Sequence, residues 1–533
     1  MTLEQKIAQL MVVGFDALPY DAGIREMIEH YQIGGIIYFA RNIESPAQVA
    51  RLTNEFQASS LAKSGIGLFI AIDQEGGRVA RLTSNKGFTE FPGAMAIGAS
   101  AHDVASAAAN ARSVGSALAA EMVAVGINTN FAPDLDVNNN PANPVIGVRS
   151  FSSDPHRVAA LGAAFIDGTQ SIGVLAFGKH FPGHGDTGTD SHLDLPVVAH
   201  PRARLDAVEF VPFKAAITAH VAGIMSAHIS FPTIDSTPGL PGTLSPKVLT
   251  GLLREELGFD GLVATDSLEM GALGRSGYPG PRAAARALGA GADLLLFNTG
   301  YAVHRETIEQ IAREVRTGVI PATRLDQAVR RVLRAKEKFG LLKPAVADAA
   351  RADAVCSAPA NQALAAGITA ASITLLRDDA ARLPLARGVT PVVITVPSAN
   401  KLAEYLHGTD VRITENVSDR DATAALAAVR AHQGAPVVLT LAGANNSQFE
   451  LAKKILATGA AVTLVAVREP YDLMMPAKFP GVPALVATYG ANPLALQAVA
   501  AVLRGEKKPA GHLPVDLPGL FPLGHGLEKF SAR

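Results

Sequence analysis

Residues 68–77 read Leu68-Phe69-Ile70-Ala71-Ile72-Asp73-Gln74-Glu75-Gly76-Gly77, an apolar run that ends in two acidic residues and a glycine turn. The run does not alternate apolar with polar residues, which is typical of a strand in a parallel sheet that helices cover. Seven other short runs in the first 300 residues have the same character. We therefore predict eight strands, at Leu10–Gly14, Gly35–Phe39, Leu68–Ile72, Ile127–Phe131, Val174–Phe177, Gly223–Ser226, Leu262–Thr265 and Leu294–Phe297.

Helix-like segments separate these runs, for example Val104–Val125 and Ala203–Ala219. Eight strands, seven helical crossovers and a length near 300 residues match a (β/α)8 barrel of the TIM type. Because strand number alone does not show closure, a doubly wound sheet is the alternative. The predicted fold class is therefore α/β, with this barrel in the N-terminal part of the chain.

A second α/β pattern follows the barrel. The helical stretch Arg324–Lys338 leads into an Ala/Asp-rich segment, Lys343–Ala354, that is typical of a connection between domains. We predict a barrel at 1–340, a linker at 341–355 and a smaller α/β layered sandwich domain at 356–533. The strands of this second domain are expected at Ile373–Leu376, Val392–Val396, Val437–Leu441, Val462–Val467 and Leu485–Tyr489.

Composition excludes several classes of protein. The 533 residues carry 47 Lys and Arg against 48 Asp and Glu, which argues against nucleic acid or an anionic membrane surface as a partner. The single cysteine, Cys356, excludes an internal disulfide and a metal held by several cysteines. No apolar run reaches the roughly 18 residues that span a bilayer, and the first residues lack a signal-peptide pattern. We expect a cytoplasmic protein, or a secreted one if a leader was trimmed.

Polar residues follow most of the predicted barrel strands. In a barrel of this kind the chemistry lies at the carboxyl ends of the strands, so these side chains are expected to meet at one mouth. A single residue of this kind is equally well explained as a helix cap. The set consists of Asp73, Asp134, Asp136, Lys179, His180, His228, Asp266 and Asn298.

Residues 179–194 read Lys179-His180-Phe181-Pro182-Gly183-His184-Gly185-Asp186-Thr187-Gly188-Thr189-Asp190-Ser191-His192-Leu193-Asp194, and their glycines and lack of helical periodicity predict a loop. The density of His and Asp allows a metal site, an ordered structural loop or acid–base chemistry. In the third case Asp190 would turn its carboxylate onto the His192 imidazole and raise its basicity. A histidine held in this way can protonate a leaving group at neutral pH.

Two further segments carry candidate functional residues. Asp266 stands where the seventh strand ends, either as a helix cap or, beside an acid on another loop, as a carboxylate nucleophile. Asp73 and Arg81 bracket a tight turn, where they either bind a polar ligand or pair with each other. The chain has no Trp, which argues against a long oligosaccharide cleft built on stacked indoles.

These segments resemble blocks of glycoside hydrolase family 3, in its β-N-acetylglucosaminidase branch. The similar blocks are 179–187 continued by 190–192, 73–79, 265–267 and 145–151, in the order that the family has them. The resemblance implies that Asp266 is the nucleophile and that His192, oriented by Asp190, is the acid/base. It also implies that Asp73, Arg81, Arg149, Lys179 and His180 hold the sugar, with no cofactor and no metal.

The implied activity is that of a retaining exo-enzyme that removes terminal β-linked N-acetylglucosamine from peptidoglycan-derived fragments, with a small carbohydrate as its partner. Because a neutral imidazole does not repel an anion, a phosphorylase that uses inorganic phosphate is an alternative. A metal-dependent hydrolase and a sugar-binding protein without catalysis are further alternatives. The sequence alone does not predict the oligomeric state.

Overall fold

The computed structural model describes residues 1–16, 20–191, 193–298, 301–443, 445–479 and 483–531. The first part of this chain forms an eight-stranded parallel sheet in the order β7-β6-β5-β4-β3-β2-β1-β8. The two end strands also meet, because Ala264 pairs with Leu294 and the Thr265 N–H donates to the Leu294 carbonyl. The predicted barrel is thus confirmed. Its strands are β1 Met11–Gly14, β2 Gly35–Tyr38, β3 Phe69–Ile72, β4 Thr129–Asn130, β5 Leu175–Phe181, β6 Gly223–Ser226, β7 Leu262–Ala264 and β8 Leu295–Phe297.

Helices surround the barrel, and local signals set their ends. In α3 (Pro46–Ser64), the Ser45 hydroxyl accepts the Gln48 N–H and Gly65 ends the helix at φ 71°. The predicted helix at 203–219 is instead two helices, α7 (Arg202–Ala207) and α8 (Phe210–Thr218). Pro212 explains the break, because it has no N–H to donate to Val208. The other helices between strands are α2 Ala22–Glu26, η1 Met27–Tyr31, α4 Ala94–Ala99, α5 Val104–Ala124, α6 Pro155–Ser171, η6 Lys247–Glu256, α9 Gly271–Arg275 and α10 Gly280–Ala290.

Strand β5 is longer than predicted. It continues through Lys179 and His180 to Phe181, so these two side chains lie in the strand and not in the loop expected from residue 179 onward. The sequence pattern concealed this because two charged residues interrupt the apolar run. A register shift against β6 between Gly178 and Phe181 accompanies the extension.

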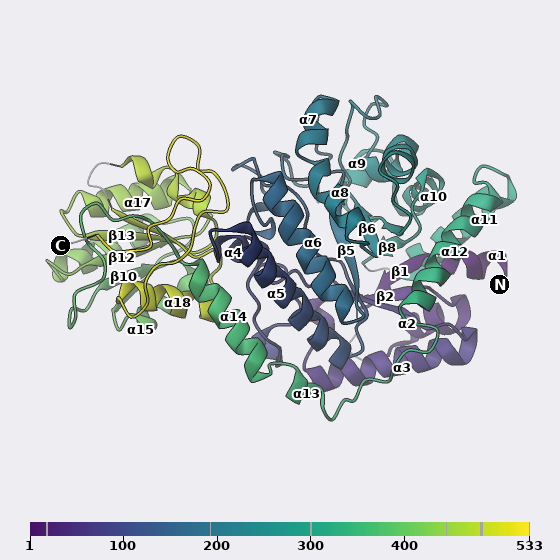
Figure 1. The fold of residues 1–533 in the computed structure, drawn as a ribbon, viewed down its shortest axis with the longest axis horizontal. Coiled ribbons are helices and arrows are strands. Elements are labelled where there is room, and N and C mark those ends of the chain that lie inside the picture. The colour runs from purple at the N-terminus through teal and green to yellow at the C-terminus, as the bar shows by residue number, and fades with distance from the viewer. Residues whose placement is uncertain (17–19, 192, 299–300, 444, 480–482, 532–533) are drawn as a thin grey trace.

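The second part of the chain holds a six-stranded mixed sheet in the order β11-β10-β12-β13-β14-β9. The five predicted strands are present, and β9 runs antiparallel to β14. A sixth strand, β11, was not predicted because it is a polar edge strand with an exposed arginine and aspartate. Figure 1 shows α17 (Asn446–Leu456) on one face of the sheet and α15 (Leu402–Tyr405) and α18 (Pro493–Leu503) on the other. The strands are β9 Thr374–Arg377, β10 Val392–Thr395, β11 Thr409–Arg412, β12 Val437–Leu441, β13 Val462–Ala466 and β14 Ala484–Ala487.

Helix α14 (Pro359–Ser372) packs against α4 and α5 and joins the two parts (Figure 1). At its start, the buried Glu121 carboxylate on α5 accepts the Ser357 N–H at 3.0 Å and the Asn361 amide at 3.1 Å. Each part contributes a side chain to the hydrophobic core of the other. Cys356 packs with the barrel core, and Met95 packs with the core of the second domain. The exact boundaries at 341–355 stay a prediction. No helix among the described residues has both the length and the hydropathy needed to cross a membrane.

Barrel helix α12 (Ala322–Lys338) carries a fully buried lysine, which leads to a pH-dependent prediction. The Lys336 amine donates to Gln9 Oε1 at 2.9 Å and lies 5.0 Å from the Phe69 ring, and burial lowers its pKa to about 7. Because the folded state disfavours the charged amine, Lys336 lowers the free energy of unfolding by its full amount below pH 7. This destabilisation declines as the pH rises toward 10. We expect Lys336→Met to be more stable than wild type at pH 6, and the difference in unfolding free energy to shrink by about 2 kcal/mol by pH 9. Urea unfolding at both pH values measures this; a difference that is constant with pH would contradict it.

Candidate active site

A cavity of about 200 Å³ lies at the carboxyl ends of the barrel strands. Six of the eight residues predicted for the site line it: Asp73, Arg81, Arg149, Lys179, His180 and Asp266. Five further polar residues, none of them among those eight, line it as well: Glu75, His184, Ser191, Ser267 and Asn298. Of the eight polar residues that follow the predicted strands, five thus lie at one mouth, Asp73, Lys179, His180, Asp266 and Asn298, and their roles stay predictions.

A chain of ion pairs forms one wall of the cavity. Lys179 at the end of β5 lies 3.0 Å from Asp73 Oδ1 and 2.8 Å from Glu75 Oε1. The Arg149 guanidinium donates to both Glu75 oxygens, at 2.9 and 2.8 Å, in a bidentate pair. Arg81 lies farther from Asp73, at 3.8 Å. Glu75 thus joins the turn after β3 to β5 and to the 147–149 turn.

Burial and charge together set the ionisation of this wall. Burial raises the pKa of the Glu75 carboxyl, but the neighbouring Arg149 and Lys179 charges outweigh burial and hold it well below its usual range. For Lys179, burial lowers the pKa, and Asp73 with Glu75 raises it above the ordinary value. Glu75, Arg149 and Lys179 are therefore charged at neutral pH. The fixed charges are suited to orienting hydroxyl groups of a small polar ligand.

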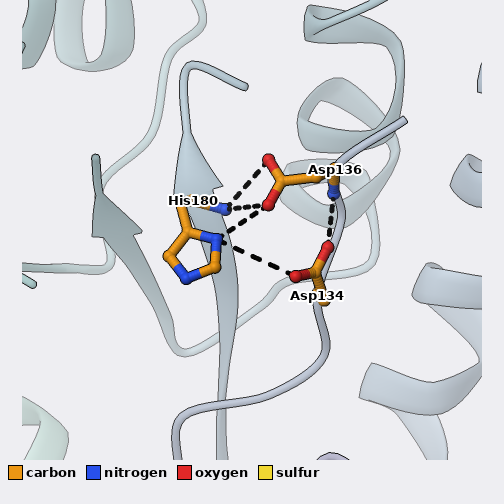
Figure 2. Close-up of side chains that lie close together, drawn as sticks. All are labelled: Asp134, Asp136 and His180. Atoms are coloured by element: carbon orange, nitrogen blue, oxygen red, sulfur yellow. Dashed lines mark hydrogen bonds and ion pairs between the residues drawn. The ribbon is translucent and has the colours of Figure 1, made fainter. Parts of the chain in front are cut away.

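A second group of acids holds His180 in place (Figure 2). The His180 Nδ1 lies 2.7 Å from Asp136 Oδ2, and the backbone N–H groups of His180 and His184 also donate to Asp136. Burial and the adjacent Asp136 raise the pKa of Asp134 well above its ordinary value. For Asp136 burial raises the pKa, but His180 and the N–H groups that donate to it outweigh burial and lower it, so Asp136 is the carboxylate that orients the imidazole.

Asp134, Asp136 and His180 also lie close enough together to be considered as metal ligands. Their present partners argue against that use. Asp136 already accepts three N–H groups, and the Arg149 guanidinium lies 3.5 Å from Asp134 and 3.4 Å from His180 Nε2. A cation would have to compete with this guanidinium charge. A second cluster, Asp186, His200 and Glu209, is likewise paired with Arg204.

Asp266 stands just after β7 at the floor of the cavity. Its Oδ1 accepts the Ser267 N–H at 2.7 Å. Burial raises its pKa, but the nearby His228 and His180, this hydrogen bond and Lys179 outweigh burial and lower it. His228 is itself fixed by Thr243 at 2.9 Å and by the Ser267 carbonyl at 2.9 Å. Asp266 is therefore an ionised carboxylate directed at the cavity, as a nucleophile requires.

The loop after β5 is tied to the barrel by His184 and Asn143. His184 contacts the Thr187 hydroxyl at 2.7 Å and the Ser191 hydroxyl at 3.0 Å, and burial lowers its pKa to about 4, so it stays neutral. The Asn143 amide donates to the carbonyls of His184 and Gly185. Asp190 lies in this loop next to Ser191, which lines the cavity. The predicted acid/base His192 lies outside the described residues, so the Asp190–His192 pairing stays a prediction.

The Asn143 contacts predict a selective effect on turnover. Asn143→Ala removes the bonds to the loop, together with the two that its Oδ1 accepts from the Val145 and Ile146 N–H groups, so we expect kcat to fall about 10-fold, because a misplaced group slows catalysis. The matched variant is Asn140→Ala. The Asn140 amide donates to the Thr187 carbonyl at 3.3 Å, and the loss of this single bond should have a smaller effect on kcat. Steady-state kinetics and thermal unfolding of both variants test this. A fall in Tm without any loss of kcat would show that Asn143 has only a structural role.

A closed barrel with an ionised carboxylate and a small, charged polar cavity at its carboxyl mouth defines a TIM-barrel enzyme with a polar substrate. Within that class, residues 2–335 match the model for the glycosyl hydrolase family 3 N terminal domain, and the chain belongs to this family of glycoside hydrolases.

Relatives extend the match over the second domain. The chain is 38% identical to Beta-hexosaminidase A of Pseudoalteromonas piscicida over 71% of this chain and 65% of that protein, just under two thirds of its length. It is 36% identical to a Beta-hexosaminidase of Alkalilimnicola ehrlichii over 57% of this chain and 84% of the relative. A solved family 3 β-N-acetylglucosaminidase from Paenibacillus sp. str. FPU-7 is 36% identical, with a TM-score of 0.88 over 97% of this chain and 99% of the other. The resemblance seen in the sequence is confirmed.

Sequence reasoning did not assign site roles to Glu75, Asp136, His184 or Asn143. Asp136 could have been found from its position, because it is one of the polar residues that follow the predicted strands. Glu75 follows Asp73 at a spacing of two, which in extended backbone places both side chains on one side. Asn143 carries no comparable signal, because its role depends on a loop 40 residues away.

Proposed function

We propose that the chain is a retaining exo-β-N-acetylglucosaminidase. The observation that carries the proposal is that six residues, assigned to the site from sequence, line one cavity of about 200 Å³. A cavity of this size is matched to one sugar ring and not to a polymer. The names of the Pseudoalteromonas and Paenibacillus relatives favour β-linked N-acetylhexosamine as that sugar.

In the proposed mechanism Asp266 attacks the anomeric carbon while His192 protonates the departing oxygen. The resulting glycosyl–Asp266 ester is resolved by a water molecule that His192, now neutral, deprotonates. Asp190 fixes the imidazole tautomer and stabilises its charged form. Asp73, Arg81, Arg149, Lys179 and His180 hold the sugar hydroxyl and acetamido groups. Two inversions at the anomeric carbon give net retention.

The finer substrate assignment is part of the same proposal. We infer that the aglycone is a peptidoglycan-derived fragment, such as a muropeptide or a disaccharide with anhydro-muramic acid. A cytoplasmic location, expected from the sequence, stays a prediction that cell fractionation would test.

The decisive experiment follows hydrolysis of a chromogenic β-N-acetylglucosaminide and identifies the first-formed product by NMR, with and without inorganic phosphate. We expect β-N-acetylglucosamine as the initial product, at a rate that neither phosphate nor a chelator changes. An α-configured product would overturn the retaining mechanism. A sugar 1-phosphate would identify a phosphorylase, and loss of activity in chelator would identify a metal-dependent hydrolase.

A further inference from the structure

A second cavity, of about 390 Å³, lies between the barrel and the second domain. The second domain contributes residues that follow its strands, among them Ser398 after β10, Ala442 after β12 and Asn492 after β14. Ligands of α/β sheets bind at these carboxyl ends, where the strand order reverses. The order does reverse here, because β10 lies between β11 and β12. The cavity therefore occupies the place where this sheet architecture accepts ligands.

Two arginines approach the cavity from opposite domains. Arg78 lies in the turn after β3 and Arg468 directly follows β13. Between described residues neither guanidinium makes a hydrogen bond, and both approach one carboxylate, that of Glu469, at 3.8 and 3.7 Å. A guanidinium has five N–H donors, so most of this capacity is available to a bound group. Burial and the nearby Arg468 lower the pKa of Arg78, which indicates that positive charges crowd this place.

The acids near the cavity do not balance these charges evenly. Glu469 is shared by both guanidinium groups, and burial with the neighbouring Asp472 raises its pKa. Glu415 also lines the cavity, but it is exposed and follows β11, the edge strand, three strand positions from β13. Three positions correspond to about 14 Å along the sheet. Arg78 and Arg468 thus share one lining carboxylate, Glu469, with Asp472 beside Glu469 and Asp190 near Arg78 as further acids.

The two cavities share a wall. Val79 lines the catalytic cavity, and its neighbour Arg78 lines the cavity between the domains. In the same way Arg149 lines the first cavity and Val148 lines the second. Both turns belong to the barrel mouth. At both places the residues that line the two cavities are neighbours in the sequence, so Arg78 lies close to the catalytic cavity.

We propose that the cavity between the domains binds an anionic group, a carboxylate or a phosphate, through Arg78 and Arg468. If the proposed function holds, on which this part rests, one source is an acidic substituent on the aglycone of the sugar substrate. The other source is a free inorganic anion. Arginine suits either, because its planar donors match carboxylate and phosphate oxygens in pairs.

The test compares wild type with Arg468→Gln, and with Arg412→Gln as the matched control. Arg412 lies on edge strand β11 with a 71% exposed side chain and pairs with Asp410. The first measurement is kcat/KM for two N-acetylglucosamine disaccharides that differ only in a carboxylate or its amide on the second sugar. The second is calorimetric titration of each protein with inorganic phosphate. Thermal unfolding verifies that each variant is folded, and Arg468→Lys serves as a charge-conserving variant.

We expect wild type to favour the acidic disaccharide and Arg468→Gln to lose about 10-fold of that preference, as for a lost charge-assisted hydrogen bond. Arg468→Lys should restore part of it, and Arg412→Gln should resemble wild type. Phosphate binding that Arg468→Gln abolishes, without any aglycone preference, assigns the site to a free anion. Absence of both effects overturns the proposal. If neither disaccharide is cleaved, the proposed function fails, and the phosphate titration still decides whether the anion site exists.

Discussion

Replacing Asp266 by Asn should lower kcat by about 10⁴-fold or more, as loss of a nucleophile does in other covalent enzymes. Asp266 is the ionised carboxylate at the end of β7, and an amide can neither attack the anomeric carbon effectively nor stabilise its positive charge. The Asn side chain keeps an oxygen that can accept the Ser267 N–H, now 2.7 Å from Oδ1. The local backbone should therefore survive, and the loss should appear in kcat rather than in stability.

Asp260→Asn is the matched control for this experiment. Asp260 precedes the same strand at the opposite end of the barrel, its side chain is 86% exposed, and it contacts Arg331 at 3.4 Å. Its variant should turn over a chromogenic β-N-acetylglucosaminide at nearly the wild-type rate. Undiminished turnover in folded Asp266→Asn would contradict the nucleophile assignment.

Azide distinguishes a missing nucleophile from a damaged site. In Asp266→Gly, azide can enter the space of the lost carboxylate and attack an activated β-glycoside from the α face. The azide nitrogen forms the new bond to the anomeric carbon and the phenolate leaves with the bonding electrons. We expect an α-glycosyl azide, identified by NMR. A β-glycosyl azide would place the attacking group elsewhere in the cavity.

Most strands of the barrel could be predicted because they are buried on both faces and are therefore largely apolar; β4, whose two residues are Thr129 and Asn130, is an exception. The same dependence on burial explains why β11 was missed and why β5 was predicted too short. Strand β11 lies at a sheet edge, where polar residues such as Arg412 are favoured, and β5 carries Lys179 and His180 just before its last residue, so its polar end resembles a loop signal. Burial of a lysine inside a strand depends on partners that sequence pattern does not reveal.

The candidate site was predictable to the extent that it lies directly after strands. Asp73 and Asp266 could be found in this way. The pairing of Glu75 with Arg149 joins residues 74 positions apart, and the tether from Asn143 to the loop depends on how two loops cross. Contacts of this kind arise from tertiary packing and leave no local periodicity. The role that we propose for Arg468 belongs to the same category, since the second domain must first be placed against the barrel.

Replacing His192 should produce a loss that depends on the leaving group. A general acid matters most when the departing oxygen is a poor leaving group, so His192→Ala should lower kcat/KM by about 10³-fold on a disaccharide. On a dinitrophenyl glycoside, whose phenolate leaves without a proton, kcat/KM should fall less than about 10-fold. The kcat on that substrate should still drop, because resolution of the glycosyl-enzyme also needs the base. A pre-steady-state burst of phenolate would show that the intermediate accumulates.

Asp190 provides the companion test, because in the proposed mechanism it acts on the substrate only through His192. Its backbone carbonyl accepts the N–H groups of Leu193 and Asp194, at 2.9 and 3.0 Å, so Asp190→Asn should leave this turn intact. We expect the loss of kcat/KM to depend on the leaving group in the same way but to be smaller, since the imidazole keeps its place but loses basicity. Asp194→Asn is the control from the same loop, with a side chain that is 56% exposed. Equal losses on activated and poor leaving groups, in both the His192 and Asp190 variants, would mean that the loop binds the sugar and does not supply the proton.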